Sequence, residues 1–166
     1  LVLYLPFSEN LINISNTTYD RSPYGNDGTL VNLNFGNVSN GTGWSSGKYG
    51  YGMEFEGEGD YVEVAHDASF NLGAFTLESW FKIDGTQGNL KIISKRKLDG
   101  TNANFQWGSL NANQWDLHWQ SGGVSKSSAI SQTADDGQWH YIAVTFPNDG
   151  TAPSWYYDGA FHTQTG

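Results

Sequence analysis

The 166-residue sequence predicts an all-β fold of short antiparallel strands. Aromatic residues make up 15% of the chain and charged residues only 15%, while glycine occupies 21 positions. This composition is typical of strands joined by tight turns. Short alternating stretches recur with turn residues between them, and no long segment has the 3.6-residue period of an amphipathic helix. The pattern therefore predicts a single β-sandwich or barrel domain over residues 1–166.

The individual strands are predicted from the alternation of apolar and polar residues. In chain order they span residues 1–7, 29–33, 51–55, 61–64, 75–83, 90–94, 104–108, 114–120, 139–146 and 154–157. The glycine-rich stretch 56–60 predicts a turn that joins 51–55 and 61–64 into a hairpin. Within 75–83, Phe75, Leu77 and Phe81 share one face, because successive side chains of a strand point to opposite sides.

Charge and hydropathy exclude two classes of partner. The net charge is −9, and the basic cluster Lys95-Arg96-Lys97 is followed by Asp99. A nucleic-acid-binding face needs many clustered Lys and Arg residues, so we expect no nucleic acid. No apolar run approaches the roughly 20 residues of a membrane span, so we expect no membrane insertion by this segment. The chain has no cysteine and therefore no disulfide.

Four matches to the N-glycosylation acceptor pattern lie near the start of the chain. Their asparagines are Asn13, Asn16, Asn37 and Asn40. Because this modification belongs to secreted proteins, the cluster predicts an extracellular or cell-surface protein. The alternative is that these residues form polar loops that never meet a glycosyltransferase.

Four groups of residues form a recognisable series along the chain. They are Tyr19-Asp20-Arg21-Ser22 with Gly25-Asn26-Asp27-Gly28, Gly47-Lys48-Tyr49-Gly50 with Asp60-Tyr61-Val62-Glu63-Val64, Phe75-Thr76-Leu77-Glu78-Ser79-Trp80-Phe81-Lys82, and Asp136-Gly137-Gln138-Trp139-His140 with Tyr157-Asp158-Gly159. The series resembles the laminin-G-like domains of the concanavalin-A-like lectin/glucanase superfamily. The resemblance implies a two-sheet antiparallel jelly-roll sandwich, with Trp80 and Trp139 at core positions.

The end of the chain departs from the pattern of this family. Members normally continue for a few more strands beyond the Tyr-x-Asp-Gly turn, whereas this sequence stops at Gly166. We expect a fragment that lacks its C-terminal strands. The alternative is a chain whose missing strands come from a neighbour, as in a filament, which predicts a homo-oligomer formed through sheet edges.

Three acidic residues match the E-x-D-x-x-E spacing of laminarinase-type glucanases, which share this fold. They are Glu58, Asp60 and Glu63. In such enzymes two carboxylates serve as nucleophile and general acid. Glu58, however, lies between two glycines, which favour a turn over a rigid strand. The same stretch also matches the non-catalytic laminin-G hairpin, so we expect no enzyme and keep the three residues as outside candidates.

A structural calcium ion is the predicted cofactor. Asp20, Asn26 and Asp60 lie in glycine-rich turns, where carboxylate and carbonyl oxygens can converge around a hard cation. The resemblance implies such a site most directly at Asp20. The alternative is that Asp20 caps a turn through hydrogen bonds to nearby backbone groups.

The stretch 114–120 has two chemically different faces. Its apolar face, expected in the core, holds Trp115, Leu117 and Trp119. Its polar face, a candidate ligand-binding surface, holds Gln114, Asp116 and His118. Trp44, in a Gly-Trp-Ser stretch, is predicted to be exposed and to stack against a sugar ring.

These observations predict a non-catalytic extracellular recognition module. Its expected partners are glycans or a protein of the cell surface. The first alternative is a structural or adhesive surface protein, such as a filament subunit. The second is a glycan hydrolase.

Overall fold

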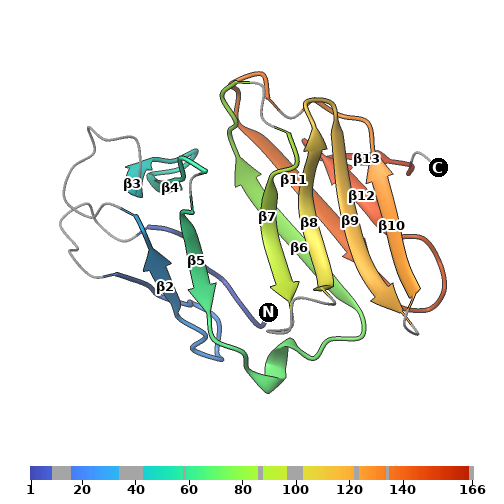
Figure 1. The fold of residues 1–166 in the computed structure, drawn as a ribbon, viewed down its shortest axis with the longest axis horizontal. Helices are drawn as coiled ribbons and strands as arrows, with labels where there is room; N and C mark the ends of the chain where they lie inside the picture. The colour runs from blue at the N-terminus through green and yellow to red at the C-terminus, as the bar shows by residue number, and fades with distance from the viewer. Residues whose placement is uncertain are drawn as a thin grey trace. The chain divides into compact units, whose positions relative to one another are not determined.

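The computed structural model describes residues 1–8, 16–33, 43–57, 59–85, 88–96, 103–121, 124–133 and 135–164, and these form an all-β chain (Figure 1). Within these ranges the helical element is a single 3₁₀ turn, Ala68–Phe70 (η2), and no helix is long and apolar enough to cross a membrane. The predicted fold class is thus confirmed. The chain divides into two compact units, residues 1–72 and 73–166, and the single domain over 1–166 stays a prediction.

The N-terminal unit contains a small sheet and a separate hairpin. The antiparallel sheet has the order β1-β2-β5, with β1 at Thr17–Thr18, β2 at Gly28–Val31 and β5 at Tyr61–Val64. The hairpin pairs β3 (Gly43–Ser46) with β4 (Tyr51–Glu54). Its turn is closed by the N–H of Gly47, which donates to the carbonyl of Gly50 at 2.9 Å. Gly50 has φ of +74°, a conformation that glycine adopts without strain.

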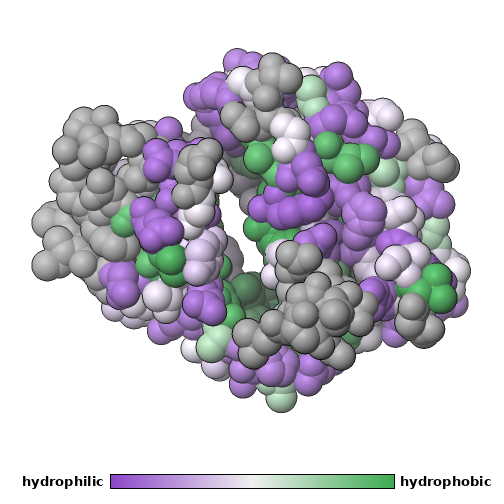
Figure 2. Space-filling model, viewed as in Figure 1, coloured by the Kyte–Doolittle hydropathy of each residue, from purple (hydrophilic) through white to green (hydrophobic). Residues whose placement is uncertain are grey.

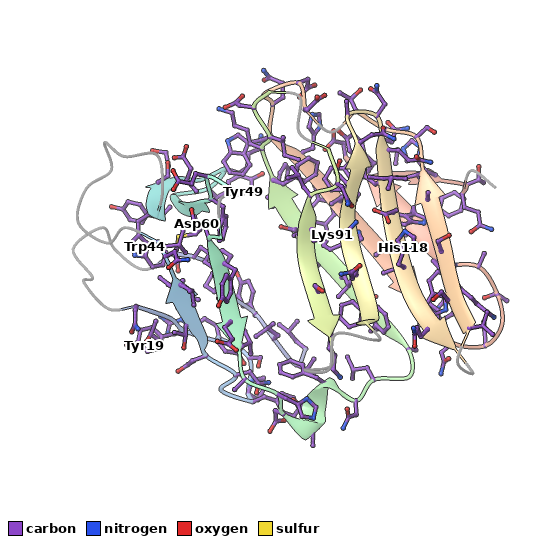
Figure 3. The ribbon with its side chains drawn as sticks, viewed as in Figure 1. Tyr19, Trp44, Tyr49, Asp60, Lys91 and His118 are labelled. Carbon is purple, nitrogen blue, oxygen red and sulfur yellow. The ribbon has the colours of Figure 1, made fainter. Side chains whose placement is uncertain are left out.

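The core of this unit is built around Trp44, which corrects the prediction of an exposed sugar platform. Trp44 is 3% exposed and packs with the buried side chains of Leu30 and Leu33. Figure 3 labels it on the ribbon of β3. In β3 it lies opposite Met53 of β4, which also contacts the cluster, so pairing turns the indole inward. The Gly-Trp-Ser stretch is a strand and not an exposed loop.

Two further predictions for this unit are wrong. Residues 1–8 form no strand; instead the N–H of Tyr4 donates to Asp20 Oδ1 at 2.8 Å, and its carbonyl accepts from Arg21 N–H at 2.9 Å. The predicted hairpin of 51–55 with 61–64 is also absent, because β4 pairs with β3 and β5 pairs with β2. Alternation identified these strands but could not identify their partners.

The C-terminal unit is a sandwich of two four-stranded antiparallel sheets, seen as two layers in Figure 1. One has the order β10-β9-β8-β7, comprising β7 (Lys91–Arg96), β8 (Ala103–Asn111), β9 (Gln114–Ser121) and β10 (Val124–Ile130). The other has the order β13-β12-β11-β6, comprising β6 (Phe75–Phe81), β11 (His140–Phe146), β12 (Ser154–Tyr157) and β13 (Ala160–His162). This is the two-sheet architecture that the sequence predicts.

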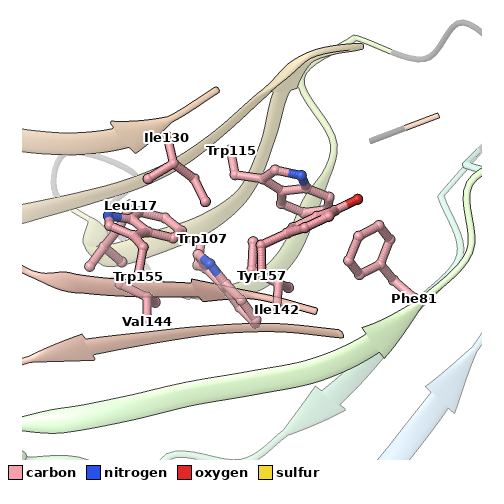
Figure 4. Close-up of a cluster of buried hydrophobic side chains, with 9 residues drawn as sticks. All are labelled: Phe81, Trp107, Trp115, Leu117, Ile130, Ile142, Val144, Trp155 and Tyr157. Carbon is pink, nitrogen blue, oxygen red and sulfur yellow. The ribbon is translucent and has the colours of Figure 1, made fainter. Parts of the chain in front are cut away.

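Aromatic side chains from both sheets fill the space between the layers (Figure 4). The buried cluster consists of Phe81, Trp107, Trp115, Leu117, Ile130, Ile142, Val144, Trp155 and Tyr157. Trp119 is partly buried and packs against it, so the predicted inward face of 114–120 is confirmed. The indole N–H of Trp155 donates to Ser128 Oγ at 2.9 Å, which gives this buried donor a partner.

Candidate functional site

The outward face of the sheet β10-β9-β8-β7 carries the predicted polar ligand-binding residues. Strand register places His118 of β9 between Gln106 of β8 and Ser127 of β10. Figure 2 shows a mostly hydrophilic surface over these strands, and Figure 3 labels Lys91 and His118 there. The face can donate and accept hydrogen bonds, as a surface for sugar hydroxyl groups must.

Asp116 lies on this face of β9 but is only 1% exposed. Its Oδ1 lies 3.4 Å from Lys91 Nζ, and the Nε2 atom of His118 lies against its Oδ2. Oδ2 nevertheless accepts no aligned hydrogen bond, so the two side chains are in contact without one. Because a buried carboxylate needs compensation, the first role of Lys91 is to neutralise Asp116.

Lys91 reaches Asp116 because a glycine stands between them. The register pairs Lys91 with Gly108 and Gly108 with Asp116. A Cβ atom on Gly108 would lie 2.0 Å from the carbonyl oxygen of Leu90, so no larger residue fits. The structure therefore brings Asp116 and His118 together. Their binding of a ligand, with the partly buried Gln114 beside them, stays a prediction.

The geometry around Asp20 shows the turn-capping alternative. Oδ1 accepts from the N–H groups of Tyr4 and Ser22, both at 2.8 Å. Oδ2 accepts from Ser22 Oγ at 2.6 Å and from Asn26 N–H at 2.8 Å. Burial alone would raise the pKa of Asp20, but these four bonds outweigh it and lower the pKa to about 2. All four partners are donors, so they stabilise the negative charge without a cation.

The other predicted calcium ligands also have protein partners. The side-chain amide of Asn26 donates to the carbonyl of Val2 and to Ser69 Oγ. Asp60 Oδ2 accepts from Glu56 N–H at 3.1 Å. In the described ranges no three His, Asp or Glu residues are grouped to hold a metal ion. The calcium ion stays a prediction.

The remaining predicted positions lie in the N-terminal unit or outside the described residues. Glu63 is exposed on β5, opposite Thr29, whereas Glu58 lies outside the described residues. Asn16 is exposed just before β1. The other predicted glycosylation sites, Asn13, Asn37 and Asn40, lie outside the described residues.

A surface that the sequence reasoning missed covers the outward face of the sheet β13-β12-β11-β6. We call it the aromatic stripe, and each of its members comes from a different one of four adjacent strands. The members are Trp80 (β6), Tyr141 (β11), Tyr156 (β12) and Phe161 (β13). Trp80 lies opposite Tyr141, with ring centroids 5.5 Å apart, and Tyr156 lies opposite Phe161 at 5.7 Å. The exposed fractions are 39% for Trp80, 40% for Tyr156 and 59% for Phe161.

Polar side chains lie beside the aromatic stripe, and one of them bonds to Tyr141. The hydroxyl of Tyr141 donates to Glu78 Oε2 at 2.7 Å, two positions before Trp80 on the same face. Burial and then the charge and hydrogen bond of Glu78 raise the pKa of Tyr141 to about 12. Farther along the two strands, Thr76 and Thr145 share a hydrogen bond of 3.0 Å between their hydroxyls. The stripe thus has polar groups beside it, one of which fixes the hydroxyl of Tyr141.

Comparison with known proteins adds one match. A laminin-G family model, described as the concanavalin A-like lectin/glucanases superfamily, matches residues 56–165, which is more than half of the chain. The chain belongs to this superfamily. No curated protein and no solved structure matches it. Membership indicates a fold that suits binding of carbohydrate or of a protein partner. Because the superfamily contains both binding proteins and glycan-cleaving enzymes, membership does not decide whether this chain is an enzyme.

Trp80 is a correction to the expected superfamily pattern. The resemblance implied a core position, but Trp80 alternates with the buried Phe81 and therefore points outward. The sequence already contained this signal: Thr76, Glu78 and Trp80 have the same parity in the strand, opposite to Phe75, Leu77 and Phe81.

Two acidic residues flank His140, which precedes Tyr141 on β11 of this laminin-G-type sandwich. His140 is held between Asp158 Oδ2 at 2.7 Å and Asp136 Oδ1 at 3.0 Å. Burial by itself lowers the pKa of His140, but the two hydrogen bonds and charges outweigh it and raise the pKa above 6.5. Nearby, Asp84 pairs with Lys82 at 3.5 Å and forms an isolated bridge with Asp136.

A shallow groove of about 400 Å³ lies beside β10, away from the stripe. Its lining includes Trp119, Lys126, Thr151, Pro153 and Gln164. The volume lies within the range of small-ligand sites, but the groove is open and its exposed surface is mostly polar. It therefore offers less apolar contact than the aromatic stripe.

Proposed function

We propose that this protein is a non-catalytic recognition module that binds carbohydrate through the aromatic stripe. The observation that carries the proposal is the exposure of Trp80, Tyr156 and Phe161, by 39–59%, on one face of four adjacent strands. Water-exposed apolar patches of this kind mark interaction sites. The C–H groups of a sugar ring stack on an aromatic face, which contributes both apolar area and a favourable electrostatic contact.

The small conformational freedom of the side chains in the stripe favours binding. Tyr and Trp side chains have only two rotatable bonds each and lose little entropy when a ligand covers them. The bond from Tyr141 to Glu78 further reduces the freedom of this surface before binding. Glu78, Thr76 and Thr145 supply acceptors and donors for sugar hydroxyl groups at its side.

Binding without cleavage is the function that this face supports. At the outward positions of β6, β11, β12 and β13, Glu78 is the carboxylate present. Hydrolysis of a glycosidic bond normally requires two carboxylates on opposite sides of that bond. The four predicted sequons and the superfamily membership support an extracellular or cell-surface location for such a module.

The test is titration of a panel of soluble glycans into the purified chain, followed by tryptophan fluorescence and calorimetry. We expect binding that Trp80→Ala weakens about tenfold, the loss that corresponds to about 1.4 kcal/mol of stacking free energy. Val124→Ala is the matched control, because Val124 is exposed on β10 of the other sheet.

Two results would count against the proposal. If neither the soluble glycans nor an insoluble polysaccharide binds, carbohydrate recognition is excluded. If the chain instead self-associates with rising concentration and Trp80→Ala abolishes this, the stripe is an interface between copies, as the adhesive alternative predicts.

A further inference from the structure

The shape and charge of the aromatic stripe indicate which carbohydrates it takes. This inference rests on the proposed function. We infer that the ligand is an uncharged, ribbon-like polysaccharide that lies along the stripe and is bound over several consecutive sugar rings. A single sugar, a chain end or an acidic polysaccharide fits the same surface less well.

The length of the stripe sets the number of sugar rings. Its four side chains come from four neighbouring strands of one sheet, β6, β11, β12 and β13. Three interstrand spacings separate the outer two strands, so the stripe extends over roughly 14 Å. A single sugar ring covers one aromatic side chain at a time, whereas an extended chain contacts Trp80 and Phe161 together.

The position of the four side chains on one face of a sheet explains why the stripe favours a flat, extended polysaccharide. All four members occupy outward positions of regular strands, and the register pairs Trp80 with Tyr141 and Tyr156 with Phe161. Tyr156 lies opposite Ala143, two positions along β11 from Tyr141, so the two pairs are neighbours on the same face. Side chains on one face of a sheet stand side by side at similar height, so they form a platform. A polysaccharide whose successive rings present their C–H groups on one side meets this platform without bending. A strongly coiled chain meets it at one ring only.

The charges around the stripe select against acidic ligands. Glu78 lies within the face, and Asp158 lies beside Tyr141, whose N–H donates to Asp158 Oδ1 at 2.8 Å. The nearby cation Lys82 is paired with Asp84 at 3.5 Å. With a net charge of −9 on the whole chain, a polyanion is repelled both at the face and at long range.

The experiment compares three probes with the intact chain. Insoluble cellulose and mannan test the neutral ribbon, polygalacturonate tests the acidic polymer, and soluble trisaccharides test the short ligand. We expect co-sedimentation with one of the neutral polymers that changes little between low and high salt, because no ion pairs are formed. Trisaccharides compete weakly and polygalacturonate binds at least tenfold less.

Variants assign the binding to the stripe. Trp80→Ala and Phe161→Ala remove its two outer members and each reduces retention on the polymer, whereas Leu110→Ala, exposed on the other sheet, retains it. Equal or tighter binding of polygalacturonate, or full competition by trisaccharides, would overturn the inference while leaving carbohydrate recognition intact. Absence of binding to every probe would overturn the proposed function as well.

Discussion

The two sheets of the C-terminal unit share one core but turn opposite chemistry outward. The sheet β10-β9-β8-β7 presents serine, glutamine and histidine, with Asp116 held beneath Lys91 and His118. The sheet β13-β12-β11-β6 presents the aromatic stripe. The core between the layers is filled by other aromatic and aliphatic side chains, and none of the outward rings belongs to it. The comparison teaches that aromatic content alone does not tell which rings pack in the core of this sandwich, whereas strand parity does.

The largest expected effect comes from an inward indole. Trp107→Ala removes a fully buried side chain and leaves a cavity, so we expect a loss of about 3–5 kcal/mol in the free energy of unfolding. Trp80→Ala on the outward face should cost less than about 1 kcal/mol. Urea denaturation of both variants measures the difference. Equal losses would remove the distinction between the two kinds of tryptophan.

The next largest effect on stability is expected from the ion pair between Lys91 and Asp116 on the polar face. Lys91→Met keeps most of the side-chain length but leaves the buried carboxylate of Asp116 without its cation, and we expect a loss of about 1–3 kcal/mol. Lys126→Met on β10 is the control, because Lys126 is exposed and lines the groove. Denaturation of the two variants side by side checks the prediction, which fails if Lys91→Met is as stable as the control.

A smaller effect concerns the contact of His140 with Asp136 and Asp158. His140 has its pKa raised above 6.5 in the folded chain, so its protonated form binds more strongly to Asp158 and Asp136 than its neutral form. The stabilisation is therefore fully present below the unfolded pKa and is lost as the pH rises through the folded pKa.

The test is the unfolding midpoint measured between about pH 5.5 and about pH 8.5, where histidine titrates. We expect the midpoint of the unmodified chain to fall over this range by more than that of His140→Gln, whose side chain does not titrate. Parallel curves for the two proteins would show that the contact with the two aspartates contributes nothing dependent on pH.

Alternation of residue type predicted much of the fold. The predicted strands 75–83, 114–120 and 154–157 correspond to β6, β9 and β12, because apolar and polar residues alternate clearly there. It missed β10, whose sequence Val-Ser-Lys-Ser-Ser-Ala-Ile has few apolar residues: the strand lies at a sheet edge, where polar residues are tolerated. Alternation also did not predict which strands pair: β4 and β5 were expected to form a hairpin, but β4 pairs with β3 and β5 pairs with β2.

The candidate site was predicted less well than the fold. Trp44 looked like an exposed loop residue, but its neighbours in space come from distant parts of the chain and bury it. Asp20 stays a predicted metal ligand; its four hydrogen-bond donors include Tyr4, 16 positions away, which no local pattern reveals. The polar face of 114–120 was predicted correctly as outward, although Asp116 is covered by Lys91 from another strand.

The measurement that tests the account most directly is polysaccharide retention by the double variant Trp80→Ala/Phe161→Ala, compared with Leu110→Ala/Val124→Ala. All four residues are exposed and apolar, but only the first pair belongs to the aromatic stripe. We expect the first variant to lose at least tenfold in affinity with little change in its unfolding midpoint, and the second to bind like the unmodified chain. Equal retention by both variants would contradict the assignment of recognition to the stripe.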